Sequence, residues 1–127
     1  MLSIIGIGMD IIYISRIQAS MERFGERFLK RVFHPVEVEM AFRRKKCAEY
    51  LAGCFCVKEA ALKAFGDFPG RGIPWSDIYI THELTGKPIL HFSGRARKLA
   101  LEKGVVYQHV TITHDGDLAV AQVILES

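Results

Sequence analysis

Residues 50–65 read YLAGCFCVKEAALKAF, and this stretch decides the fold. Placed on a helix, it is apolar on nearly every side except at Lys58, Glu59 and Lys63. A helix that is apolar all round is a buried one. Gly66, the residue type that often follows the last turn of a helix, comes directly after it. The spacing therefore predicts a buried central helix, from about residue 49 to the end of this stretch, around which the other elements pack.

The remaining pattern predicts a strand before this helix and two pairs of strands after it. The segment from Ile4 to Ile12 is rich in β-branched residues and alternates, with Gly6, Gly8 and Asp10 on one face. Those glycines leave room for something to approach the strand, although glycine in a strand also marks a bulge or tight packing. The other expected elements are helices from Ile14 with a break at Gly25, from Pro35, and from Ser93 to Lys103, and strands over 77–81, 88–92, 106–113 and 118–125. Together they predict an α+β fold, with an antiparallel sheet packed against helices, in a single domain over 1–127.

Composition excludes several classes of protein. Half of the 127 residues are hydrophobic and 24% are charged, which is typical of an ordered globular domain. The net charge is only +3 and the phenylalanines fall mostly on helical core spacing, so no nucleic-acid partner is expected. No apolar run is long enough to span a membrane. Cys47, Cys54 and Cys56 are an odd set that completes no zinc pattern, so we expect reduced thiols in a cytoplasmic protein.

The charged residues of the central helix have two interpretations. Glu59 and Lys63 stand at i and i+4, where an ordinary helical ion pair contributes only a few tenths of a kcal/mol. Alternatively, Asp10 of the first strand meets Glu59 across a contact between strand and helix, and two carboxylates there would repel. A Mg²⁺ ion resolves this repulsion, because it takes one or two protein carboxylates, several waters and substrate phosphate oxygens. Lys63 would then add a positive charge for phosphate.

Three motifs, in order along the chain, carry a family resemblance. They are GIGMDII at residues 6–12 followed by Arg16, FCVKEAALKA at residues 55–64, and VTITH at residues 110–114. With LAG at 51–53, GKP at 86–88 and AVAQVILE at 119–126, the chain resembles the holo-[acyl-carrier-protein] synthase family from end to end. The resemblance implies the 4'-phosphopantetheinyl transferase fold. It also implies Mg²⁺-dependent transfer of 4'-phosphopantetheine from coenzyme A to a serine of apo acyl carrier protein, which leaves adenosine 3',5'-bisphosphate and serves fatty acid biosynthesis.

The resemblance also implies roles for individual residues. Asp10 and Glu59 would hold Mg²⁺, with Mn²⁺ as an alternative metal, and with Lys63 they form the expected catalytic set. The residue that removes the serine proton is left open among Glu59, Lys63 and a metal-ordered water. The residues expected to bind coenzyme A are Lys63, Thr113, His114, and Gly66 and Arg71 of the glycine-rich loop over residues 66–72. Taken without the resemblance, a histidine like His114 is more often structural, and a glycine-rich loop is usually only a turn.

Acyl carrier protein is the expected macromolecular partner. Basic residues recur along the first helix and its continuation, beside apolar ones, and such a face suits an acidic helix. The residues expected to dock the carrier are Arg16, Met21, Arg23, Phe24 and Arg27, with Lys30 a weaker candidate. The alternative is a solvent-facing charge stripe. The resemblance further implies a homotrimer with active sites at subunit boundaries.

Three positions depart from the family pattern. Cys54 stands where relatives frequently carry arginine, Phe68 where they often have a further glycine, and Asp115 where they have a small residue. If that arginine aids coenzyme A binding, the basic run over 43–46 has to supply the charge, unless this run is only a solvated helix end. These departures motivate the alternative of a catalytically weak or inactive relative that binds acyl carrier protein.

Overall fold

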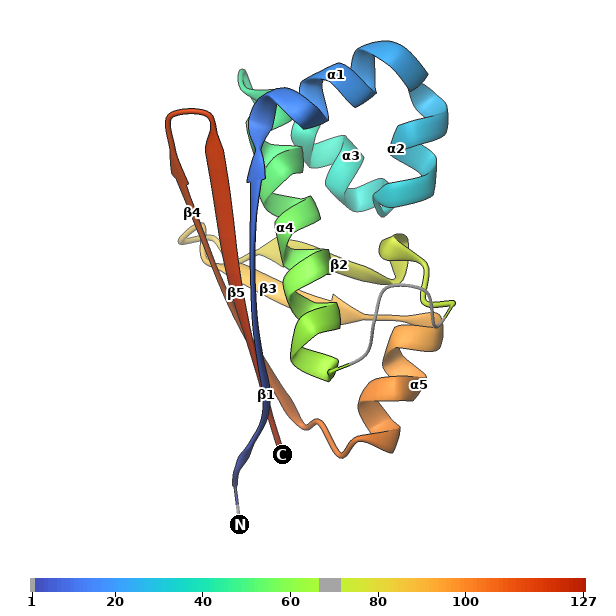
Figure 1. Ribbon diagram of the computed structural model, residues 1–127, viewed down its shortest axis with the longest axis vertical. Helices are drawn as coiled ribbons and strands as arrows, with labels where there is room; N and C mark the ends of the chain where they lie inside the picture. The colour runs from blue at the N-terminus through green and yellow to red at the C-terminus, as the bar shows by residue number, and fades with distance from the viewer. Residues whose placement is uncertain (1, 67–71) are drawn as a thin grey trace.

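The computed structural model describes residues 2–66 and 72–127, and it is built around one long helix (Figure 1). This helix, α4 (Cys47–Phe65), has a three-stranded sheet on one side and a two-stranded sheet on another. The helices before it are α1 (Ile14–Phe24), α2 (Glu26–Val32) and α3 (Pro35–Phe42), and the elements after it include η1 (Trp75–Asp77) and α5 (Gly94–Glu102). None of the described helices is long and apolar enough to cross a membrane.

The strands form two separate antiparallel sheets. The larger has the order β1 (Ile4–Tyr13), β5 (Leu118–Glu126), β4 (Tyr107–Asp115), so the first strand pairs with the last. The smaller is the hairpin of β2 (Ile78–His82) and β3 (Pro88–Phe92). The predicted α+β class is confirmed. The strands form two sheets, and α4 packs against both of them.

The contact between β1 and α4 brings backbone against backbone. A Cβ atom at Gly6 would lie 1.7 Å from the carbonyl oxygen of Ala64, and one at Gly8 would lie 1.8 Å from that of Ala60. No side chain fits at these separations, so only glycine permits the observed approach. Of the two interpretations of these glycines, tight packing is the correct one, and the group that approaches the strand is the helix itself.

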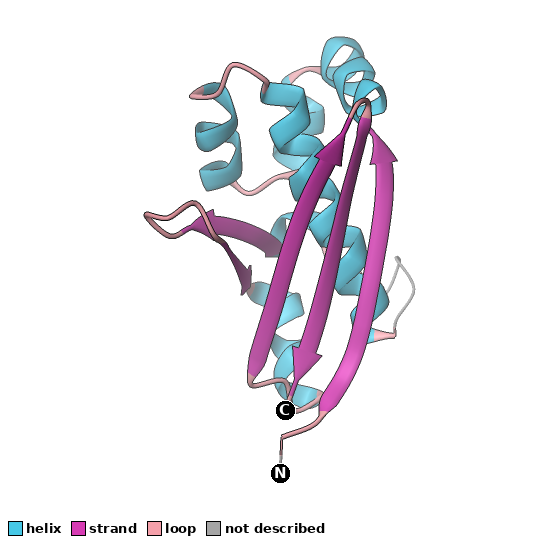
Figure 2. Ribbon diagram, turned by 90° about the vertical axis from the view of Figure 1, so that its left-hand side faces the viewer, coloured by secondary structure: helices cyan, strands magenta, loops and turns pink. Residues whose placement is uncertain are grey.

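The two faces of the larger sheet differ sharply. Its inner face packs on α4 with the fully buried small side chains of Ala119, Ala121 and Val123. Its outer face carries Ile7, Met9, Ile11 and Tyr13 of β1, which are 53–59% exposed. Paired with them in register are Ile124, Gln122, Val120 and Leu118 of β5. Figure 2 shows the helices on one side of this sheet and none of them on the other. The part of the outer face formed by β1 is therefore apolar and exposed.

The sequence signals at helix ends hold in part. Gly66 adopts the left-handed conformation, with φ of 77°, and ends α4 as predicted. Gly25, with φ of 54° and ψ of −131°, splits the first predicted helix into α1 and α2. Since the chain turns there, basic residues before and after Gly25 do not lie on one continuous helix.

Gly8→Ala should destabilise the fold by more than about 3 kcal/mol, because the added methyl group overlaps the backbone of α4 and forces the sheet away from it. Gly104→Ala is the matched control. Its Cβ meets no atom within 4 Å, so it should cost only the left-handed backbone penalty at φ of 76°, about 1–2 kcal/mol. Urea unfolding measures the stability of both variants. Equal losses in their free energy of unfolding would contradict the packing role of Gly8.

Candidate active site

Asp10 and Lys63 meet at the contact between β1 and α4. The ammonium of Lys63 lies 3.2 Å from Asp10 Oδ1 and donates to the carbonyl oxygen of Met9 at 2.9 Å. The Asp10 side chain is only 18% exposed, whereas that of Lys63 is 56% exposed. The largely buried carboxylate of Asp10 therefore contacts the ammonium group of Lys63, which can move into solvent.

Glu59 lies one helical turn before Lys63 but does not pair with it. Its Oε1 accepts a hydrogen bond of 3.2 Å from the indole N–H of Trp75. Among residues 2–66 and 72–127, the ion-pair partner of Lys63 is Asp10. Lys63 therefore pairs with Asp10 of the strand and not with Glu59 of its own helix.

Asp10 and Glu59 both lie close to one buried thiol. Burial raises the pKa of Cys56 to about 12, together with the negative charges of Asp10 and Glu59. Cys56 also donates to the carbonyl oxygen of Ala119 at 3.3 Å. Both acids therefore lie within electrostatic range of the same thiol of α4.

This donor set fits Mg²⁺. The described residues contain no cluster of three or more His, Cys, Asp and Glu side chains that could enclose a metal ion, so the protein offers carboxylates without a complete cage. Mg²⁺ is normally held in this way, with water and substrate phosphate completing its coordination. The ammonium of Lys63 already occupies a position beside Asp10 that suits a cation.

A basic pocket lies at the other end of α4. It has a volume of about 350 Å³ and is lined by Arg44, Lys45, Lys46, Glu49, Tyr50 and His114. His114 donates through Nε2 to the carbonyl oxygen of Glu49 at 3.2 Å. The ring lies close to Gly53, where a Cβ would be in tight contact with this nitrogen, at 3.3 Å. The guanidinium of Arg44 lies 4.4 Å from the centre of the Tyr50 ring.

The remaining residues expected to bind coenzyme A are dispersed. Thr113 pairs with Val120 on the outer face of the larger sheet, opposite to the face from which His114 reaches α4. Gly66 is exposed at the end of α4. Arg71, Phe68 and most of the glycine-rich loop lie outside the described residues.

The three arginines expected to dock a carrier protein are all exposed. Arg16 and Arg23 lie on α1, and Arg27 lies on α2. Of the expected docking residues, Phe24 and Arg27 line a groove of about 740 Å³, and its other lining residues are Phe28, Lys30, Arg31, Val32, Phe55 and Trp75. Met21 is half-buried and packs against the core, so it does not share this exposure. Phe55 and Trp75 were not predicted for this region, although Trp75 is the one tryptophan of the chain.

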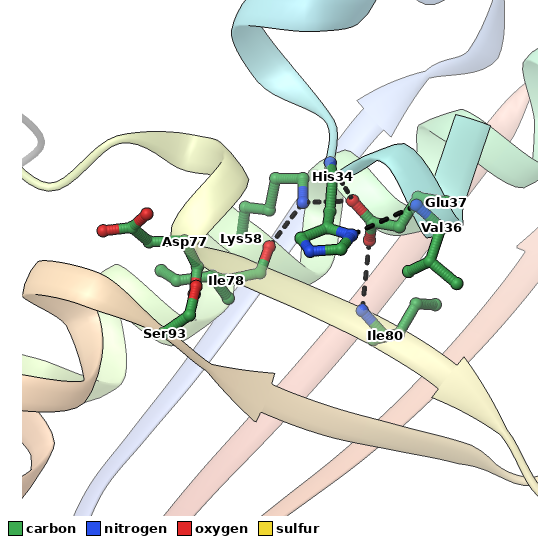
Figure 3. A network of polar contacts seen from close by, with 8 residues as sticks. All are labelled: His34, Val36, Glu37, Lys58, Asp77, Ile78, Ile80 and Ser93. Atoms are coloured by element: carbon green, nitrogen blue, oxygen red, sulfur yellow. Dashed lines mark hydrogen bonds and ion pairs between the residues drawn. The ribbon is translucent and has the colours of Figure 1, made fainter. Parts of the chain in front are cut away.

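Lys58 and Glu37 form a buried ion pair that the sequence did not indicate (Figure 3). Both side chains are fully buried, and Lys58 Nζ lies 2.5 Å from Glu37 Oε1 and also donates to the carbonyl oxygen of Ile78. The Glu37 carboxylate further accepts from the backbone N–H groups of His34 and Ile80, both at 3.1 Å. This network joins α3, α4 and β2, and it holds the residue next to Glu59 in place.

Cys54 lies on the same side of α4 as this network. It is fully buried, and burial raises the pKa of its thiol, as does the negative charge of Glu37. Its thiol therefore takes no part in the basic pocket, whose charge comes from Arg44, Lys45 and Lys46.

Comparison with known proteins identifies the family. Residues 6–123 match the family model of the 4'-phosphopantetheinyl transferase superfamily. The chain is 44% identical over 124 residues to the holo-[acyl-carrier-protein] synthase of Trichlorobacter lovleyi, an alignment that covers 98% of each chain. The chain therefore belongs to the holo-[acyl-carrier-protein] synthase family and is an enzyme of the phosphopantetheinyl transferase class.

Solved structures of this family have the same fold. The synthase from Neisseria meningitidis superposes with a TM-score of 0.90 at 30% identity, over 98% of this chain and all of that one (100%). The synthase from Bacillus anthracis, solved in complex with coenzyme A (3',5'-ADP), gives a TM-score of 0.80 at 35% identity, over 98% of this chain and 97% of that one.

Lys58→Met should lower the free energy of unfolding by about 3–5 kcal/mol, because it leaves the Glu37 carboxylate charged and buried without its cation. The double variant Lys58→Met with Glu37→Gln should recover part of this loss, since it removes the unpaired charge. Urea unfolding of both variants tests this. A single variant as stable as the parent protein would contradict the buried ion pair.

Proposed function

We propose that this enzyme transfers 4'-phosphopantetheine from coenzyme A to a serine of apo acyl carrier protein, with Mg²⁺, and releases adenosine 3',5'-bisphosphate. The observation that carries the proposal is the convergence of Asp10, Glu59 and Lys63 where β1 meets α4, in a chain of this family. The complex of the Bacillus anthracis relative with coenzyme A (3',5'-ADP) supports the donor substrate.

Asp10 and Glu59 would hold the metal ion. When bound, Mg²⁺ or Mn²⁺ supplies positive charge to the pyrophosphate of coenzyme A and so stabilises the charge that develops as the phosphoanhydride breaks. Lys63 would contact phosphate as a mobile point charge, because its exposed ammonium can leave Asp10 without unpacking α4. These three residues form the proposed catalytic set.

Coenzyme A would extend from this centre to the basic pocket at the start of α4. There, Arg44, Lys45, Lys46 and His114 offer cations and a donor for a phosphate group. We retain Thr113, Gly66 and Arg71 as proposed contacts, of which Thr113 lies on the outer sheet face. A residue on that face contributes only if a second subunit places its substrate there.

The carrier protein would dock on α1 and the groove beside α2. Arg16, Arg23 and Arg27 supply positive charge, and Phe24 lines the groove as an apolar anchor. An acidic helix with apolar residues is complementary to such a surface. Met21 would act mainly through the core that supports α1.

Self-association through the outer face of the larger sheet is part of the proposal. Exposed apolar patches of this kind mark interaction sites, and here Ile7, Met9, Ile11 and Tyr13 are all more than half exposed. The family resemblance implies a trimer, with active sites at the subunit boundaries. Thr113 on this face would then reach a neighbouring active site.

The cellular setting follows from the proposed substrates. All three cysteines are free, which suits the reducing cytoplasm. Modification of acyl carrier protein in that compartment would serve fatty acid biosynthesis.

Intact-mass spectrometry of an apo acyl carrier protein, incubated with this enzyme, coenzyme A and Mg²⁺, tests the proposal. We expect a gain of one phosphopantetheinyl group, abolished by a chelator and by serine-to-alanine substitution in the carrier. No gain across several carriers would favour the alternative of an inactive relative that only binds the carrier, to which the substitutions at Cys54, Phe68 and Asp115 point.

Glu59→Gln should lower kcat about 100-fold or more while leaving the melting temperature nearly unchanged, because it removes a metal-binding charge at constant shape. Glu102→Gln on α5 is the matched control and should retain the parent rate. Near-normal turnover by Glu59→Gln would refute the metal assignment.

Arg16→Glu should raise the KM for carrier protein about tenfold or more and leave the KM for coenzyme A within about twofold, because only the carrier meets α1. Lys98 is also exposed, on α5, and Lys98→Glu should change neither KM. Initial rates at varied substrate concentrations separate the two constants, and equal changes in both would rule out docking on α1.

Ile11→Glu should weaken self-association roughly 100-fold or more, because it buries a charge in an apolar contact. Leu101→Glu, which alters an exposed apolar residue on α5, should leave the assembly intact. Light scattering coupled to size-exclusion chromatography gives the mass in solution. A monomeric parent protein, or an unaltered Ile11→Glu assembly, would contradict the proposed interface.

A further inference from the structure

Trp75 lies outside the family motifs and makes a hydrogen bond to the proposed catalytic set. Its indole nitrogen lies 3.2 Å from Glu59 Oε1, and the donor and acceptor come from different elements, η1 and α4. An indole N–H is a donor only, so it can orient a carboxylate but cannot itself bind a metal ion. Trp75 is therefore a hydrogen-bond donor to a proposed metal ligand.

The short helix that carries the indole is bonded to a neighbouring element. The indole ring lies 6.1 Å from that of Phe55, measured between centroids, at an angle of 41°. The short helix η1 is tied to the start of α5, because Asp77 O accepts from Ser93 N at 2.8 Å and Asp77 Oδ2 accepts from Arg95 N at 2.9 Å. The element that bears the donor is therefore fixed relative to α5.

We propose that Trp75 is a positioning residue for Glu59: its N–H holds Oε1 and leaves Oε2 to face the metal ion. Across the described parts of the chain, Glu59 has no other side-chain hydrogen-bond partner, so its orientation depends on this contact. Carboxylates that bind metals are themselves hydrogen-bonded, and loss of such a partner typically costs 10–100-fold in metal affinity or activity, as an order of magnitude. The inference rests on the proposed metal-dependent transfer.

Trp75 also links the groove proposed for the carrier protein to the proposed metal site. Trp75 and Phe55 line the groove proposed for the carrier protein, and the N–H edge of the same indole contacts Glu59. A carrier protein that contacts this ring would therefore affect the orientation of Glu59, a proposed metal ligand.

Mn²⁺ binding in the presence of coenzyme A, followed by the electron paramagnetic resonance signal of free Mn²⁺, tests the role of Trp75 without any turnover. Trp75→Phe keeps an aromatic ring in the groove and removes the N–H, so the Mn²⁺ dissociation constant should rise roughly tenfold. Phe55→Leu removes the neighbouring ring but keeps the N–H, and its dissociation constant should stay within about twofold of the parent value. In transfer assays, the loss in Trp75→Phe should be recovered at high Mg²⁺, a recovery that a merely structural defect would not show.

A second replacement guards against misfolding of Trp75→Phe. Because the chain contains one tryptophan, a benzothiophene isostere, which has sulfur in place of N–H, can be introduced at this position alone. It should reproduce the weaker Mn²⁺ binding at unchanged shape. Parent-like Mn²⁺ affinity in both variants would overturn the role of Trp75 while leaving the proposed function intact. Failure of the parent enzyme to bind Mn²⁺ would overturn the metal assignment and this inference together.

Discussion

The backbone contact between β1 and α4 is the constraint on which the rest of the structure depends. Gly6 and Gly8 allow the carbonyl groups of Ala64 and Ala60 to approach the strand more closely than any side chain would permit. Because Asp10 follows two residues after Gly8 on the same face of β1, this approach brings its carboxylate to Lys63 and to the stretch of α4 that carries Glu59. The packing of the core and the geometry of the proposed catalytic set thus have the same origin.

Charge is distributed along α4 according to burial. Lys58 is enclosed and neutralised by Glu37, which fixes the rotation of the helix, whereas Glu59 and Lys63 lie where solvent and substrate can reach them. Basic residues gather at the start of the helix with His114. One helix therefore provides the core of the domain, a carboxylate and an ammonium of the proposed catalytic set, and one wall of a basic pocket.

Much of this architecture was predictable from the sequence, and the exceptions have physical reasons. Periodicity and glycine positions predicted the strands, the central helix and its end at Gly66. Asp10, Glu59 and Lys63 stood out as charges in apolar elements and in the family motifs before the contact of Asp10 with Lys63 was visible. The buried Lys58 was missed because periodicity cannot distinguish which of two adjacent charges, Lys58 or Glu59, points inward. Its partner Glu37 lies on a different helix. Trp75 was missed because a single aromatic residue in a loop carries no pattern, and only the folded chain brings it to Glu59.

We predict a single metal ion shared by the strand and the helix, and anomalous scattering from crystals grown with Mn²⁺ and coenzyme A would locate it. The expected result is one peak within about 2.2 Å of a carboxylate oxygen of both Asp10 and Glu59, with phosphate oxygens among the other ligands. A peak bound to only one of these residues, or one remote from both, would show that close packing of β1 on α4 does not create the metal site.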